Sequence, residues 1–102
     1  MKNLFEYAVP THGEWFKTLL QNDNVTIEVI VSSDTPEPKV YNQPHDEAVL
    51  LIDGEATLEL QGQEITMRPG DFLHIPAHTP HRVLKTAKGS RWLAIHTKEA
   101  LC

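Results

Sequence analysis

The chain has 102 residues, 40% of them hydrophobic, which fits a single domain spanning residues 1–102 with one modest core. Nine Lys and Arg against fourteen Asp and Glu give a net charge of −5, which argues against a nucleic-acid partner. The longest apolar run, Ala48–Ile52, is too short to cross a membrane, so no membrane partner is expected. The only cysteine, Cys102, cannot form an internal disulfide, and we expect a cytoplasmic location.

The first third of the chain carries strand and turn signals. Trp15–Leu20 fits a strand or a helical turn, and we favour a strand because Asn22–Asn24 has the composition of a turn into a paired strand. Val25–Val31 is β-branched at nearly every position and alternates, which predicts a half-buried strand. Ser32–Lys39 contains two prolines and is predicted to be a loop inside the domain.

The centre of the chain predicts a β-hairpin. Two apolar segments, Ala48–Ile52 and Ala56–Leu60, flank Asp53-Gly54, which is a favourable two-residue hairpin turn. Alternation in the second segment predicts that Ala56, Leu58 and Leu60 point inward.

Four further short strands are expected in the second half of the chain. They are Glu64–Met67, Phe72–Ile75, Arg82–Lys85 and Arg91–His96. Short strands separated by turns at regular intervals indicate an all-β sandwich or barrel, and the charges of Arg82 and Arg91 are expected to face solvent.

The second half of the chain also resembles a known family. Pro69–Asp71, Ile75-Pro76 and Pro80–Arg82 are similar, in residue type and spacing, to the second conserved motif of the cupins. The resemblance covers residues 24–97 approximately and implies a double-stranded β-helix, the cupin or jelly-roll barrel.

The first cupin motif, a His-X-His pair followed by Glu or Gln and a glycine turn, is matched only in its second half. Glu47 stands seven residues before Gly54, as the family's carboxylate does before its glycine. Tyr41 and Gln43 occupy the positions of the histidine pair, and His45 lies between them and Glu47. A subset of small bacterial cupins shares this Tyr-X-Gln-X-X-X-Glu pattern, so the missing pair resembles a subgroup trait.

The resemblance implies a metal centre inside the barrel. It places Glu47 and His81 on neighbouring strands that face the interior, and alternation puts Gln43, His45 and Glu47 on one face of an extended segment. Imidazole, carboxylate and amide groups suit a divalent ion such as Zn, Fe, Mn or Ni. The predicted ligands are Gln43, Glu47 and His81, with His45 or His96 as a fourth.

These residues also allow plainer interpretations. His81 and Gln43 could form hydrogen bonds inside the barrel without metal, and His45 could be a surface-loop histidine. In a catalytic reading, Glu47 is a ligand or general base and Tyr41 a proton donor. His78 is a candidate for orienting a ligand, whereas His74 and His12 are given no role.

Three classes of function stay open at this point. The resemblance implies one divalent ion with dioxygenase or isomerase-like chemistry on a small polar molecule. The missing His-X-His pair also allows a metal-free module that binds or senses a small molecule. The third possibility is a structural protein that only dimerises, because cupins commonly pair through sheet edges, and a homodimer is expected in any case.

Overall fold

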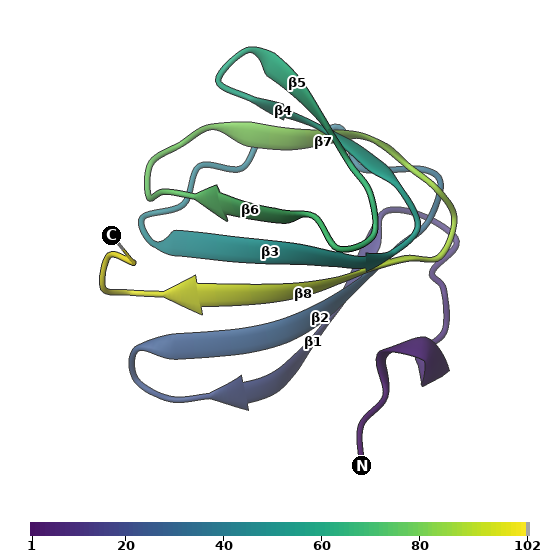
Figure 1. Ribbon diagram of the computed structural model, residues 1–102, viewed down its shortest axis with the longest axis horizontal. Helices are drawn as coiled ribbons and strands as arrows, with labels where there is room; N and C mark the ends of the chain where they lie inside the picture. The colour runs from purple at the N-terminus through teal and green to yellow at the C-terminus, as the bar shows by residue number, and fades with distance from the viewer. Residues whose placement is uncertain (102) are drawn as a thin grey trace.

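The computed structural model describes residues 1–101, in which eight strands form two antiparallel sheets (Figure 1). Cys102 lies outside the described residues. The elements are η1 (Leu4–Glu6), β1 (Glu14–Gln21), β2 (Val25–Ser32), β3 (Asp46–Asp53), β4 (Ala56–Leu60), β5 (Gln63–Met67), β6 (Phe72–Ile75), β7 (His81–Thr86) and β8 (Ser90–Thr97). The predicted strands are therefore confirmed, including the one over Trp15–Leu20.

The two sheets lie face to face. The larger has the strand order β1-β2-β8-β3-β6 and the smaller the order β5-β4-β7. Figure 1 shows the smaller sheet above the larger one, with long connections crossing between them. This arrangement confirms the all-β, jelly-roll prediction. Within the part of the chain that the structure describes, no helix is long and apolar enough to cross a membrane.

The predicted hairpin at Asp53-Gly54 is wrong. Strand β3 pairs with β6 and β8, whereas β4 pairs with β5 and β7. The turn therefore carries the chain from one sheet into the other, and the strands that it joins share no ladder. Turn chemistry is a local property, while the choice of pairing partner depends on the whole barrel.

The hydrophobic core fills the space between the sheets. Its buried members come from alternate positions on facing strands and are Ile30, Val49, Leu51, Ala56, Leu58, Met67, Trp92 and Ala94. Ala56 and Leu58 are buried, as their alternation predicted, whereas Leu60 at the end of β4 is only half-buried. Burial of these side chains holds the two layers together and leaves one end of the interior for polar groups.

The outer face of the larger sheet is covered by the N-terminal segment. Arg91 is only 8% exposed, and its guanidinium lies 5.7 Å from the ring centre of Phe5. The expectation that Arg91 faces solvent is therefore wrong, because η1 folds back over this strand. Arg82 remains half-exposed and pairs with Glu59 at 3.0 Å.

A buried carboxylate ties three segments to the start of β3. Asp46 accepts hydrogen bonds from the backbone N–H groups of Leu101 and Ala77 and lies 3.0 Å from Nε2 of His74. These bonds, the Leu101 and Ala77 amides first, lower the pKa of Asp46 to about 2. His74, which was given no role, is a structural partner of this carboxylate.

Candidate functional site

A small hollow lies between the two sheets, with a volume of about 80 Å³. Drug-sized ligands occupy cavities of roughly 300–1,000 Å³, so this space suits an ion with a few waters or a compact molecule. Apolar side chains of the core form much of its wall. The polar groups of the wall are Glu14, Glu28, Tyr41, Gln43, Glu47, His81 and His96.

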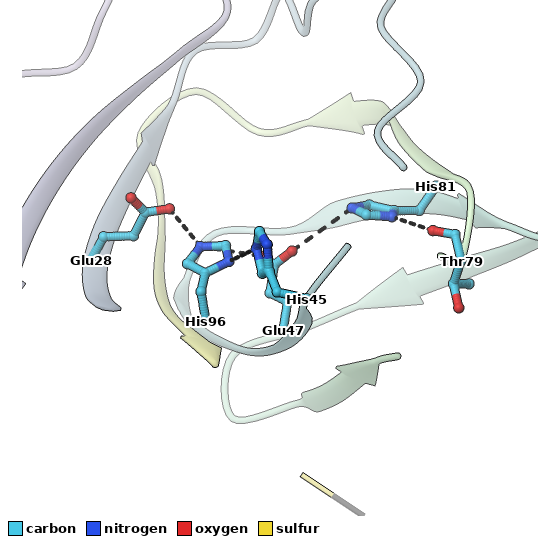
Figure 2. A network of polar contacts seen from close by, with 6 residues as sticks. All are labelled: Glu28, His45, Glu47, Thr79, His81 and His96. Carbon is cyan, nitrogen blue, oxygen red and sulfur yellow. Dashed lines mark hydrogen bonds and ion pairs between the residues drawn. The ribbon is translucent and has the colours of Figure 1, made fainter. Parts of the chain in front are cut away.

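The structure brings Glu47 and His81 together across the hollow (Figure 2). Glu47 comes from β3 of the larger sheet and His81 from the start of β7 in the smaller one. Their side chains approach to 3.8 Å between Oε1 and Nε2, and both residues are less than one tenth exposed. An acid and an imidazole, one from each layer, therefore share a site largely shielded from water.

Hydrogen bonding fixes the orientation of the His81 ring. Nδ1 lies 2.9 Å from the carbonyl oxygen of Thr79 and donates to it, so the lone pair of the neutral ring is on Nε2 and faces Glu47. The Tyr41 ring stacks on His81 with a centroid distance of 5.7 Å. Backbone hydrogen bonds join the same two residues in both directions. Such support typically orients a histidine that binds a metal.

The Glu47 carboxylate has no hydrogen-bond donor among the described residues. Its ion-pair partners are His81 Nε2 at 3.8 Å and His96 Nε2 at 4.0 Å. Burial raises the pKa of Glu47, and the neighbouring imidazoles offset only part of that effect. A buried carboxyl in this position favours a cation or a hydroxyl donor as its partner.

A second polar chain runs through His96 to the outside of the barrel. His96 Nε2 lies 2.8 Å from Glu28 Oε1, and His96 Nδ1 lies 3.0 Å from His45 Nε2 (Figure 2). Burial lowers the pKa of His96, but the bond to Glu28 and the charges of Glu47 and Glu28 outweigh it, so the pKa is raised. The pKa of His45 is lowered, by burial first and by His96 second. Of the two rings, His96 is therefore the more basic.

Two predicted ligands differ in how they face the hollow. Gln43 lines it, and its buried Oε1 has no hydrogen-bond partner within residues 1–101. His45 instead lines a neighbouring groove together with Gln43 and His96. The His78 side chain is exposed, and its backbone N–H donates to the Gln43 carbonyl at 2.7 Å. His78 thus supports the Gln43 segment through its backbone.

The side chains that line the hollow can bind a metal only if the Gln43 amide is one of the ligands. Of the residues that the structure places, no three His, Cys, Asp or Glu side chains are arranged to hold one ion. Gln43 Oε1, the Glu47 carboxylate and His81 Nε2 form a mixed oxygen and nitrogen set that first-row divalent metals accept. Both His96 nitrogens already have partners, so His96 could join only by leaving Glu28 or His45.

Two acidic residues of the hollow were not singled out from the sequence. Glu14 and Glu28 lie on β1 and β2 and point toward the interior. The sequence could have indicated Glu28, because it lies two positions before Ile30 and therefore on the same face of the strand. Alternation alone does not say which face of that strand is inward.

The chain belongs to the cupin family. Its residues 27–96 match the family model of the cupin domain. It is 40% identical over 57 residues to the quercetin 2,3-dioxygenase of Bacillus subtilis (strain 168), a match that covers 52% of this chain and 17% of that protein.

Solved structures agree with this assignment. A candidate mannose-6-phosphate isomerase from Ralstonia eutropha JMP134 is 38% identical, with a TM-score of 0.86 over 97% of this chain and 98% of that one. A cupin superfamily protein from Desulfitobacterium hafniense DCB-2 is 26% identical, with a TM-score of 0.79 over 91% and 84% of the two chains.

Proposed function

We propose that this cupin holds one divalent metal ion in the hollow, with Gln43, Glu47 and His81 as ligands, and presents it to a small molecule. One observation carries the proposal: Gln43, Glu47 and His81 line one small hollow, where the buried Oε1 of Gln43 has no hydrogen-bond partner within residues 1–101 and Glu47 and His81 approach only to 3.8 Å. Leaving such groups unsatisfied is costly, and a cation would satisfy all three.

We propose that Glu28, His96 and His45 orient the site from outside rather than bind the ion. His96 holds its position through hydrogen bonds on both ring nitrogens, and its Nε2 lies 4.0 Å from Oε2 of Glu47. A proton on His96 would lower the pKa of Glu47 and so favour the ionised carboxylate, the form needed of a ligand or a base.

A bound divalent ion would polarise an oxygen of the small molecule. In this site Glu47 would bind the ion or move a proton, and Tyr41 would donate one. Burial and the nearby charge of Glu14 raise the pKa of Tyr41, so its hydroxyl stays protonated at neutral pH. Dioxygenase or isomerase-like chemistry remains the proposed reaction class, in keeping with the names of the Bacillus and Ralstonia relatives.

Elemental analysis tests the proposal directly. Protein purified without metal stripping should contain close to one metal ion per chain, and the combined change Glu47→Ala and His81→Ala should reduce the content to background. His12→Ala, which removes an exposed imidazole from the segment before β1, is the control and should leave the content unchanged.

Metal content near zero after expression in metal-supplemented medium would contradict the proposal. It would favour the second candidate, a metal-free module that binds a small molecule. The observation behind that alternative is that no three His, Cys, Asp or Glu in residues 1–101 are arranged around one ion. A ligand-induced thermal shift that persists in EDTA would support the alternative.

A further inference from the structure

Glu14 is a polar residue of the hollow that the proposed metal site does not use. It lies at the start of β1, the edge strand of the larger sheet. A second cavity of about 30 Å³ shares Glu14, Phe16, Tyr41 and Val83 with the hollow. Glu14 therefore lines both spaces, and it is less buried than Glu47.

Buried hydrogen bonds hold this carboxyl in position. The Ser32 hydroxyl donates to Glu14 Oε2 at 2.6 Å, and the indole N–H of Trp92 donates to the same hydroxyl at 3.0 Å. Ser32 and Trp92 are both buried. No hydrogen bond from the described residues reaches Oε1 of Glu14, which leaves that oxygen free to accept one from a ligand.

The charge of the hollow restricts what can enter. Three carboxyl groups line it, those of Glu14, Glu28 and Glu47, and the described lining includes no Lys or Arg. Burial raises the pKa of Glu14, Ser32 lowers it, and the charge of Glu47 raises it further, so these groups already repel one another. A carboxylate or phosphate ligand would add a negative charge with no lysine or arginine to meet it.

The second argument comes from Glu47, which is 6% exposed and has no hydrogen-bond donor within the described part of the chain. A buried acceptor without a donor, in the same hollow as Glu14, points to a ligand that brings its own donor. Much of the remaining wall is apolar, with Phe16, Ile30 and Val83 among its side chains. Such a wall suits a hydrocarbon body.

We propose that Glu14 is a specificity-determining residue, which accepts a hydrogen bond from a hydroxyl group of an uncharged, largely apolar ligand. Ser32 and Trp92 act as positioning residues for it. The inference rests on the proposed function in taking the hollow as the ligand site, but the selection against anions comes from Glu14 itself. It applies to the metal-free hollow, because a bound divalent ion would itself attract an anion.

Benzyl alcohol and benzoate form a suitable probe pair, since they share a ring and differ in charge. Ligand-observed NMR titration of the wild-type protein is run with and without EDTA, and in EDTA benzyl alcohol should bind at least about tenfold more tightly than benzoate. Glu14→Gln should reduce this preference about tenfold. Glu64→Gln, which removes an exposed carboxylate on β5, is the control and should leave the preference unchanged.

Equal or tighter binding of benzoate by the wild type in EDTA would overturn the inference, as would failure of both probes to bind there. An unchanged preference in folded Glu14→Gln would also overturn it. Metal analysis of the same samples separates the two proposals. Absent metal with the preference intact contradicts the metal site alone, whereas bound metal without the preference contradicts the role of Glu14 alone.

Discussion

The hydroxyl of Ser32 satisfies two buried polar groups at once. It accepts from the Trp92 indole and donates to Glu14, and its own exposure is zero. We predict that Ser32→Ala lowers the free energy of unfolding by about 1–3 kcal/mol, because the indole N–H is left buried without its acceptor. Urea denaturation measures the change.

Thr35→Ala is the control for Ser32→Ala, since the Thr35 hydroxyl is exposed and bonds only to Asp34 in the loop after β2. Its effect should stay within about 0.5 kcal/mol. Equal losses of stability in the two variants would contradict a special role for the Ser32 hydroxyl.

At the scale of single residues, the sequence located part of the candidate site. The positions of Glu47 and His81 beside one hollow followed from the cupin motifs, and their metal-binding role stays a prediction. Glu28 was missed because alternation in Val25–Val31 separates two faces without saying which is inward, and Glu14 was missed because it lies just before the strand predicted over Trp15–Leu20. The free Oε1 of Gln43 could not be predicted either, because it depends on the neighbours that the fold supplies.

At the scale of elements, the turn between β3 and β4 is the most constrained connection. Gly54 has a φ of +92°, and a Cβ atom there would lie 2.7 Å from the Ser90 Cα. We predict that Gly54→Ala destabilises the protein by about 2–5 kcal/mol, the sum of left-handed backbone strain and overpacking. Thermal or urea unfolding measures this loss.

Gly62 offers a matched control within the same chain. It has a φ of +82°, yet no atom lies within 4 Å of where its Cβ would be. Gly62→Ala should therefore cost only the backbone strain, about 1–2 kcal/mol. Similar losses at both glycines would show that the close approach of Ser90 has no energetic consequence.

The strands themselves could be predicted, since β-branched composition and alternation are local signals. Their pairing could not, and the Asp53-Gly54 turn shows the reason. The same dipeptide closes a hairpin or redirects a strand into a second sheet, and only the full set of core contacts decides between the two. The family resemblance predicted the barrel, whereas the register of the strands depends on contacts between distant segments of the chain.

At the scale of the whole molecule, Asp46 joins the start of β3 to the C-terminal segment and to the loop after β6. Its pKa of about 2 lies below the ordinary value of 3.8. The carboxylate therefore contributes stability above about pH 4, and this contribution is lost as the pH falls from about 4 to about 2. The difference in urea midpoint between wild type and Asp46→Asn should be constant near neutral pH and shrink over that window.

Asp23→Asn removes an exposed carboxylate in the turn after β1 and is the control. Its effect on the midpoint should be smaller than that of Asp46→Asn at every pH above about 4. A difference for Asp46→Asn that stays constant down to about pH 2 would contradict the role of the charge.

The expected homodimer stays a prediction, and the exposed Phe72 on edge strand β6 is compatible with it.

The acid and the imidazole that face each other across the hollow belong to different layers of the sandwich. A metal ion or small molecule that contacts both side chains therefore joins one sheet to the other. Any ligand that binds the folded chain and not the unfolded one raises the free energy of unfolding, and the increase grows with the logarithm of ligand concentration. In this small protein, binding of a ligand at this position would also hold the two sheets together.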